Sequence, residues 1–274
     1  LQVSQTSNSD LFWAIRGGGG NFGVATSFEY RLYSLTEVFG GALTYPPGAI
    51  SELLRMYQQF TAKAPDEIMV VAMIVSSKQG PRFVIRFRYC GAPSLGNQLL
   101  GSLQAPIKPE EETVNVMPYL EAQTTEFPQP PKPLPYLETS LFLPELNETA
   151  IEAITTAIQD APPRMRVMMW HMHGAVTRVH IADTAFPIRE SGQVVQLRGD
   201  WNAPEEQASA RQWTKLLRAT LDPFSRGIYV NHLSEPSDNY IRVAYGPNYE
   251  RLAKIKKKYD PTNVLALNPN IKAA

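Results

Sequence analysis

Residues 10–23 read DLFWAIRGGGGNFG and join a short apolar helix to a run of four glycines. Glycine reaches positive φ without a steric penalty, so the run lets the backbone turn sharply and approach a neighbour or a ligand closely. The run lacks the Lys-Ser/Thr pair of a phosphate-binding loop, and it follows a helix instead of preceding one. The pattern therefore predicts a tight glycine turn packed against neighbouring backbone.

A second motif, YGPNYERLAKIKKKYDPTN, occupies residues 245–263. Leu252, Ile255 and Tyr259 recur at helical spacing and are predicted to form the buried stripe of a surface helix. The opposite, solvated face is predicted to carry Lys254, Lys256, Lys257 and Lys258. Cations also suit the C-terminal end of a helix, so these lysines do not indicate a nucleic-acid site.

The 274 residues carry no formal net charge and are 43% hydrophobic, which is typical of a soluble globular protein with one large or two smaller domains. The balanced charge argues against nucleic acid or an anionic membrane as a partner. The longest apolar runs, such as residues 68–75, fall far short of the roughly 20 residues of a membrane-spanning helix. The single cysteine, Cys90, excludes an internal disulfide and is predicted to be a buried, unreactive thiol. The compartment, cytoplasmic or secreted, stays open.

The segment between the two motifs alternates predicted strands with predicted helices. Apolar residues at helical spacing predict helices at residues 50–60, 95–103, 148–159 and 205–220. Alternating or short apolar runs predict strands at residues 24–32, 38–44, 67–76, 82–89, 113–117, 137–143, 166–179 and 193–201. Strands followed by a covering helix predict an α+β fold, in which helices cover one face of an antiparallel sheet. Five prolines at residues 128–135 predict an extended loop, either a linker or the rim of a substrate entrance.

The two motifs, separated by a domain-sized insert, resemble the berberine bridge enzyme-like branch of the FAD-linked oxidases, which share the fold of vanillyl-alcohol oxidase and p-cresol methylhydroxylase. In that family the first motif, matched here by residues 10–26, ends the FAD-binding domain. The second motif, matched by residues 245–271, folds back on that domain. Residues 183–187 and 229–231 match weaker landmarks of the family. The resemblance implies an FAD-dependent oxidoreductase.

The resemblance also implies a domain organisation. Residues 1–35 would be a remnant of the FAD-binding domain, residues 36–228 the substrate domain, and residues 229–274 a C-terminal segment that returns to the FAD lobe. The two chain ends would then form a partial FAD-binding lobe. Family members carry an upstream pyrophosphate-binding domain, usually with a histidine bonded to the flavin, and this sequence contains no such region. The chain is therefore interpreted as a C-terminal portion whose partners are FAD, a small-molecule substrate and the missing N-terminal polypeptide.

Two catalytic residues are implied by the same resemblance. The acid–base residue of the family lies on a central strand shortly before a tryptophan, which places it at Gln196, where berberine bridge enzyme has a glutamate. An amide cannot take up a proton near neutral pH, although it can orient a substrate. Tyr229 is the second candidate, as a phenol that accepts a proton if a neighbouring cation lowers its pKa. The alternatives are that Gln196 is a polar residue of a sheet face and that Tyr229 is a packed aromatic residue beside a turn.

Further site residues follow from neighbouring positions. Asn231 would orient the substrate, because alternation on a predicted strand sends it to the same face as Tyr229. His171 and His173 share one side of another predicted strand and are interpreted as substrate-lining or structural residues. Two histidines without a neighbouring acidic or cysteine cluster do not make a zinc site, so no metal site is predicted. The resemblance implies that FAD is contacted by Gly19, Gly20, Asn21, Tyr229, Asn231, Asn268 and Asn270.

The leading hypothesis is an oxidase or dehydrogenase that transfers a hydride from a small alcohol, a sugar or a secondary metabolite to N5 of the flavin. One alternative is a descendant that has lost the flavin and acts as a lyase, hydrolase or isomerase. Another is a binding fragment without catalytic activity. Visible flavin absorbance of the purified protein separates the first hypothesis from the other two.

Overall fold

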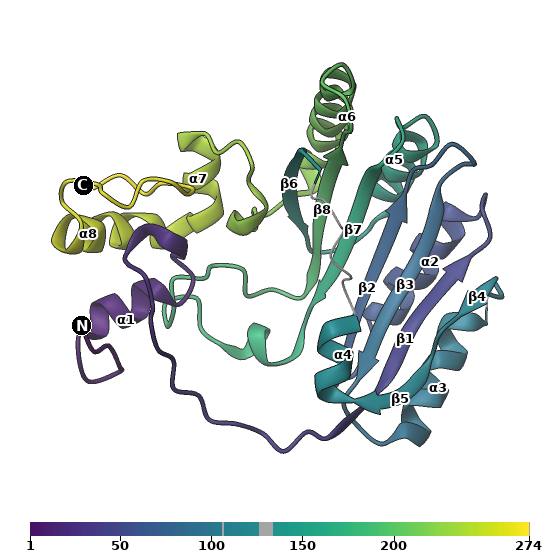
Figure 1. Cartoon of the computed structure of the whole chain (residues 1–274), viewed down its shortest axis with the longest axis horizontal. Helices are drawn as coiled ribbons and strands as arrows, with labels where there is room; N and C mark the ends of the chain where they lie inside the picture. The colour runs from purple at the N-terminus through teal and green to yellow at the C-terminus, as the bar shows by residue number, and fades with distance from the viewer. Residues whose placement is uncertain (106, 126–133, 274) are drawn as a thin grey trace.

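An antiparallel sheet organises the central part of the chain (Figure 1). The computed structural model describes residues 1–105, 107–125 and 134–273, so the predicted proline loop lies mostly outside the described residues. The strands follow the order β4-β1-β3-β2-β7-β8-β6, and β5 pairs with β1 outside this path. They are β1 (Glu37–Tyr45), β2 (Ile68–Val75), β3 (Arg82–Tyr89), β4 (Glu111–Glu112), β5 (Asn115–Pro118), β6 (Tyr136–Leu143), β7 (Met165–Met172) and β8 (Gly192–Asp200).

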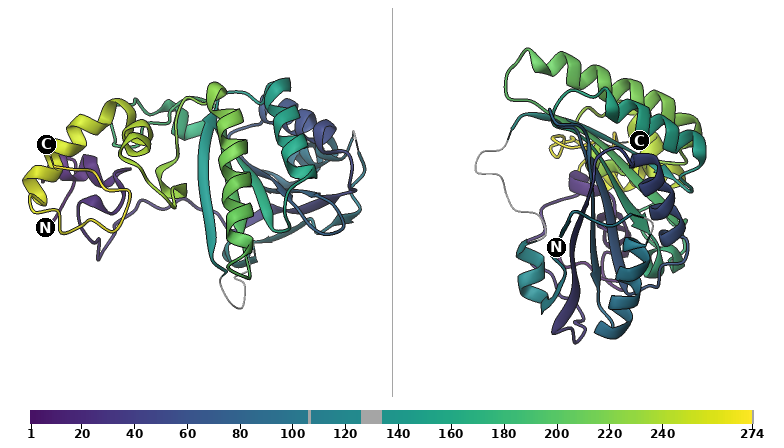
Figure 2. Two further views of the ribbon diagram at one scale, coloured as in Figure 1. Left: turned by 90° about the horizontal axis from the view of Figure 1, so that it is seen from above. Right: turned by 90° about the vertical axis from the view of Figure 1, so that its right-hand side faces the viewer.

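One face of the sheet is covered by helices α2 (Ile50–Thr61), α3 (Pro93–Gln104), α5 (Glu148–Gln159) and α6 (Glu206–Leu221), as Figure 2 shows. The short helix α4 (Tyr119–Thr125) lies on the opposite side, next to β5. The sequence patterns explain this layering. Leu53, Leu54 and Tyr57 form the buried stripe of α2, and every second residue of β3, such as Phe83 and Ile85, is buried beneath the helices. The α+β prediction is confirmed.

The two ends of the chain lie together beside the sheet and form a second apolar core (Figure 1). We call this unit, residues 1–23 and 228–273, the terminal lobe. Its helices are α1 (Ser9–Ile15), α7 (Asp238–Tyr245) and α8 (Tyr249–Tyr259). Polar contacts join α1 to α8: Asp10 accepts hydrogen bonds from the Tyr259 hydroxyl at 2.9 Å and from Lys258 Nζ at 2.7 Å.

Short 3-10 helices occupy several connections: η1 (Gly19–Asn21), η2 (Gly174–Arg178), η3 (Asp222–Phe224), η4 (Val230–His232) and η5 (Gly246–Asn248). Two strand predictions are corrected here. The strand predicted at residues 166–179 ends at Met172, and η2 follows it. The strand predicted around Tyr229 is wrong. The segment bonds to the backbone of β6 at Phe142, before Tyr229, and the Tyr229 backbone then bonds to the Ser140 side chain and to His232 N of its own 3-10 turn.

Residues 24–36 also differ from prediction, because they form no strand. The segment runs as an irregular connection between the terminal lobe and β1 (Figure 1), and the alternating pattern finds no partner strand in the described chain. Several of its large apolar side chains are exposed, namely Val24, Phe28, Tyr30, Leu32 and Tyr33. The alternating pattern therefore predicted an extended backbone. Whether such a segment joins a sheet also depends on a partner strand, which the pattern does not identify.

Two further side chains lie where the sequence did not place them. Lys256 was predicted on the solvated face of its helix and is instead fully buried, since Asp260 and two backbone carbonyls satisfy its ammonium group. Cys90 was predicted to be buried and is exposed, because β3 ends one residue earlier at Tyr89. Within the described residues, every helix is too short or too polar to span a bilayer.

Candidate functional site

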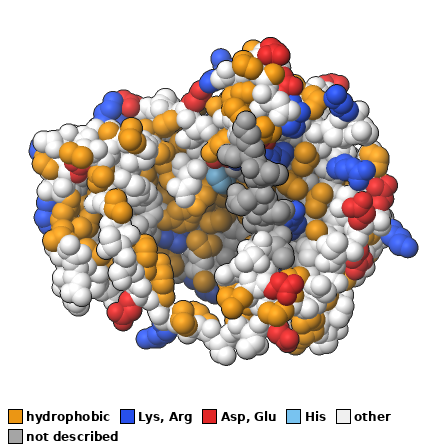
Figure 3. Space-filling model, viewed as in Figure 1, with side chains coloured by type: hydrophobic (Ala, Val, Ile, Leu, Met, Phe, Trp, Pro, Cys, Tyr) orange, Lys and Arg blue, Asp and Glu red, His pale blue; other side chains and the backbone are white. Residues whose placement is uncertain are grey.

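A cavity of about 800 Å³ lies between the terminal lobe and the sheet face that the main helix layer leaves open. Figure 3 shows the hollow near the centre of the molecule, with hydrophobic side chains on its walls. The sheet contributes Trp170 and Met172 from β7 and Val194 from β8. The terminal lobe contributes Ile15 and the backbone of the glycine run. The cavity thus lies between residues of the terminal lobe and a small apolar cluster on the open sheet face that includes Trp170, Met172 and Val194.

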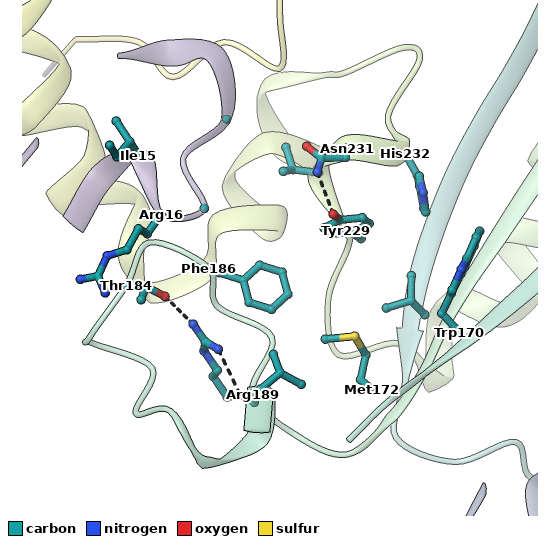
Figure 4. Close-up of a pocket in the computed structure, with 15 residues that line it drawn as sticks. Ile15, Arg16, Trp170, Met172, Thr184, Phe186, Arg189, Tyr229, Asn231 and His232 are labelled. Atoms are coloured by element: carbon teal, nitrogen blue, oxygen red, sulfur yellow. Dashed lines mark hydrogen bonds between the residues drawn. The ribbon is translucent and has the colours of Figure 1, made fainter. Parts of the chain in front are cut away.

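Aromatic rings form the inner wall of this cavity (Figure 4). The Tyr229 ring contacts Phe186 edge-on with 6.1 Å between ring centroids, and it contacts His232 with 4.9 Å. His232 in turn lies 5.2 Å from the Trp170 ring. Burial, with a smaller contribution from Arg198, lowers the pKa of His232 to about 4, so this ring is neutral at physiological pH.

Several polar groups of the cavity bond to each other, as the dashed lines in Figure 4 show. Asn231 Nδ2 donates to the Tyr229 hydroxyl at 2.8 Å. Arg189 donates to the Thr184 hydroxyl and, at 3.0 Å, to the Val176 carbonyl oxygen. The cavity wall thus combines apolar surface with a few polar groups whose positions are fixed by hydrogen bonds.

A charged cluster occupies the same sheet face next to the cavity. Gln196 follows cavity-lining Val194 by two residues on β8, so both side chains point to one side. Gln196 Nε2 donates to Glu138 Oε2 of β6 at 2.6 Å, and Arg198 Nη1 lies 3.4 Å from the same oxygen. Arg198 also binds Asp200 Oδ1 at 2.9 and 3.1 Å. Burial raises the pKa of Glu138, although Arg198 and Gln196 oppose that change.

The glycine run packs as a turn. Gly17 has φ of 127°, and a Cβ there would overlap the backbone of Phe186, so only glycine fits. Of the glycines predicted to contact FAD, Gly19 lines the cavity, whereas Gly20 lies against Asn268. Asn21 is fully buried, and its amide bonds to Gly18, Pro269 and Ile271 of its own chain. Its side chain therefore ties the two chain ends together.

Asn268 and Asn270 lie in the terminal lobe without lining the cavity. Asn268 Nδ2 donates to the Gly20 carbonyl oxygen at 3.0 Å. The Oδ1 atoms of both asparagines are buried and have no hydrogen-bond partner among the described residues. Buried acceptors without a donor are costly, so these two oxygens suit a ligand that presents N–H groups, as the flavin ring system does.

His171 and His173 lie away from the cavity. His171 pairs across strands with Gln193, whose amide contacts Tyr57 and Thr61 of α2, so this side of β7 faces the helices. The two imidazoles stack with 4.4 Å between centroids. Burial, with a contribution from His173, lowers the pKa of His171 to about 4. Within the described residues, no group of three or more His, Cys, Asp or Glu side chains is placed to hold a metal ion.

The structure thus brings Gly19, Tyr229 and Asn231 to one cavity, with Gln196 next to it, and leaves the histidine pair on the other face. Sequence reasoning missed four residues that line the cavity, namely Trp170, Phe186, Arg189 and His232, and it missed Glu138, which contacts Gln196 beside the cavity. Trp170 and Met172 could have been found, because alternation places them opposite the histidines. Glu138 could not, since its contact with Gln196 depends on the pairing of β6 with β8.

Comparison with known proteins agrees with this geometry. The family model described as "Berberine and berberine like" matches residues 228–272. An FAD-linked oxidoreductase of Dictyostelium discoideum is 28% identical over 99% of this chain and 60% of its own length. An FAD-linked oxidoreductase of Bacillus subtilis strain 168 is 29% identical over 99% of this chain and 61% of its own length. The chain is related to the berberine bridge enzyme-like FAD-linked oxidoreductases.

Solved structures share the berberine bridge enzyme-like fold over the whole chain. 6-Hydroxy-D-nicotine oxidase from Arthrobacter nicotinovorans superposes with a TM-score of 0.82 at 22% identity, covering 100% of this chain and 63% of that one. A berberine bridge enzyme variant, a reticuline dehydrogenase, superposes with a TM-score of 0.85 at 19% identity, covering 98% and 62%. The resemblance inferred from the two terminal motifs is confirmed. The chain spans about 60% of the length of the curated relatives named above.

Proposed function

We propose that this chain forms the substrate-facing part of an FAD-dependent oxidoreductase, an oxidase or dehydrogenase. The observation that carries the proposal is the cavity between the terminal lobe and the open sheet face, which combines aromatic walls with glycine backbone. Bound FAD supplies the hydride acceptor, N5 of its ring. The substrate would be a small alcohol, a sugar or a secondary metabolite, as the names of the related oxidoreductases and oxidases indicate for those proteins.

The residues present fit a flavin. Gly19 offers backbone without a side chain, and the buried Oδ1 atoms of Asn268 and Asn270 lack donors within the described chain. The proposed domain organisation follows from this fit: residues 1–35 and 229–274 would belong to the FAD lobe and residues 36–228 to the substrate domain. Two apolar cores, one in the terminal lobe and one under the sheet, support this division.

The site roles remain those predicted from the sequence, with the structure limiting some of them. Tyr229 would activate the substrate hydroxyl or amine, and Asn231 would hold the Tyr229 phenol through their hydrogen bond of 2.8 Å. Gln196 would orient the substrate from the sheet face. For His171 and His173 the packing against the α2 side favours a structural role over substrate binding.

A second polypeptide region is also proposed as partner, namely the N-terminal flavin-domain segment of the relatives. Phe28, Tyr30 and Leu32 expose 65%, 72% and 86% of their surface on one stretch with strand-like alternation. Exposed apolar side chains at this density mark a contact surface. A strand of the flavin domain added beside residues 24–32 would bury these side chains and pair the backbone.

The test is a flavin titration read by tryptophan fluorescence. FAD added to the purified protein should quench the fluorescence of Trp170, so the Trp170→Phe substitution should remove most of the quenching. Trp213→Phe should leave the quenching in place, since Trp213 lies under the helices and donates to Ala157. The protein co-produced with the N-terminal segment of a relative should also show flavin absorbance. A colourless complex without any quenching by FAD would contradict the proposal.

A further inference from the structure

Among the described residues, those that line the cavity include no carboxylate, although the chemistry needs a proton acceptor. Removal of a hydride from the carbon of an alcohol or amine requires that the O–H or N–H proton leave as well. Gln196 cannot take that proton, because an amide is not basic near neutral pH. We propose that Glu138 is the proton acceptor of this cavity, an assignment that rests on the proposed function.

The position of Glu138 follows from strand pairing. Glu138 pairs with Arg198 and Ser140 pairs with Gln196, so Glu138 and Gln196 lie diagonally on neighbouring strands and on the same face. The hydrogen bond of 2.6 Å from Gln196 Nε2 to Glu138 Oε2 fixes both side chains. The contact of Arg198 Nη1 uses the same oxygen, Oε2. Oε1 is therefore the atom assigned to receive the proton.

The neighbouring arginine neutralises the negative charge of Glu138 only in part. Arg198 is the cation that faces it, but this guanidinium makes its shorter contacts with Asp200, at 2.9 and 3.1 Å against 3.4 Å to Glu138. Arg166 of β7 also binds Asp200. The positive charge of Arg198 contributes to the low pKa of His232, so His232 is neutral at physiological pH. Burial raises the pKa of Glu138, which brings a carboxylate closer to the range in which a general base works well.

Tyr229 is less suited to the same task. A phenol accepts a proton only after it has lost its own, and this requires a cation beside it. The arginines that line or adjoin the cavity stack on other rings, namely Arg16 on Phe12 at 4.4 Å, Arg189 on Phe186 at 5.0 Å and Arg198 on Tyr136 at 3.8 Å. Tyr229 instead accepts a hydrogen bond from Asn231. Tyr229 would therefore activate the substrate hydroxyl or amine through a hydrogen bond, and Glu138 takes the proton.

The step balances. The substrate C–H bond breaks and its two electrons leave with the hydride to flavin N5, so the substrate is oxidised and the flavin is reduced. The substrate O–H or N–H bond breaks and its proton binds Glu138 Oε1, while the carbon forms a double bond to oxygen or nitrogen. Glu138 then returns the proton to solvent before the next turnover.

Glu138→Gln tests this assignment because it removes the basic oxygen and keeps an acceptor for Gln196 Nε2. The matched control is Glu148→Gln, since Glu148 also pairs with an arginine but is exposed at the start of α5. The wild-type flavoprotein is screened with cellobiose, benzyl alcohol and nicotine, and the rate of flavin reduction by the active compound is measured against pH. Glu138→Gln should lower this rate by at least about 100-fold and remove its decline at low pH, whereas Glu148→Gln should change neither.

A second measurement needs neither flavin nor substrate. The ¹³C signal of the Glu138 carboxyl, identified by its absence in Glu138→Gln, should titrate above the ordinary pKa of glutamate, and Glu138→Asp should keep the acid limb of the pH profile. An unchanged reduction rate in Glu138→Gln, or titration at or below the ordinary value, would overturn the assignment. A protein that binds no flavin, or whose flavin no compound reduces, contradicts the proposed function instead, and the titration still decides on Glu138.

Discussion

Lys256 Nζ lies 2.7 Å from Oδ2 of Asp260 inside the terminal lobe, and the lysine has no exposed surface. The same ammonium donates to the carbonyl oxygens of Asn21 at 2.9 Å and Leu265 at 3.0 Å. One cation thus joins α8 to the glycine turn and to the C-terminal segment. Its hydrogen bond lowers the pKa of Asp260 to about 2, so the carboxylate stays charged at all physiological pH values.

Replacing Lys256 should destabilise the terminal lobe strongly. Lys256→Met leaves a buried carboxylate and two carbonyl groups without their cation, and breaking a buried pair in this way costs roughly 3–5 kcal/mol. Lys257→Met, on the exposed neighbour, should change the free energy of unfolding by less than about 0.5 kcal/mol. Urea denaturation followed by tryptophan fluorescence measures both. Equal effects of the two substitutions would contradict the structural role of Lys256.

Gly17→Ala should destabilise the protein more than an alanine at another glycine with positive φ. Gly17 has φ of 127°, and a Cβ there would overlap the Phe186 backbone, whereas Gly48, with φ of 96°, has open space around it. Gly48→Ala therefore reports the conformational cost alone, on the order of 1–2 kcal/mol. Thermal denaturation of both variants gives the difference. A Gly17 variant as stable as the Gly48 variant would show that Phe186 does not pack on the turn.

Stability should fall with pH below 6.5, partly because of His171. Its pKa is about 4 in the folded protein and about 6.5 when it is unperturbed, so protons bind preferentially to the unfolded chain between these values. Each such histidine contributes at most about 1.4 kcal/mol per pH unit in this window. His171→Phe should make the pH dependence of unfolding shallower, and His180→Phe, at an exposed position, should not. Identical pH profiles for both variants would contradict the burial of His171.

Phe28→Ser should leave the stability of the chain nearly unchanged and reduce its self-association. The Phe28 ring is 65% exposed and stacks only on Tyr30, at 5.7 Å, among the aromatic residues of the described chain. Little packing is lost, so the free energy of unfolding should change by less than about 0.5 kcal/mol. Leu216→Ser, at another exposed apolar residue, is the control. Light scattering measures association, and equal scattering by wild type and Phe28→Ser would argue against residues 24–33 as a contact surface.

Much of the fold was predictable from the sequence because its elements depend on local patterns. The stripe of Leu53, Leu54 and Tyr57 predicted α2 to within a residue, and α5 begins and ends as predicted. Features that depend on distant partners were not predictable. The burial of Lys256 requires carbonyl groups 235 and 9 residues away, and residues 24–32 look like a strand whether or not a neighbour pairs with them.

The candidate site divides in the same way. Tyr229 and Asn231 were placed on one face for the wrong reason, since a 3-10 turn and not a strand brings them together. Alternation along a strand correctly placed His171 and His173 on one side of the chain. It does not predict which face of β7 packs against the helices. Glu138 became visible only through the register that sets it diagonally to Gln196.

The terminal lobe also has a consequence for how the protein is made. Asn21 Oδ1 accepts a hydrogen bond from the backbone N–H of Ile271, a contact that spans 250 positions of the chain. During synthesis the sheet and its helices leave the ribosome before residue 271 does. They can therefore fold before the glycine turn makes its contacts with the C-terminal residues. Loop closure over such a separation is slow relative to the pairing of adjacent strands. We therefore expect the terminal lobe, the part proposed to face FAD, to form last.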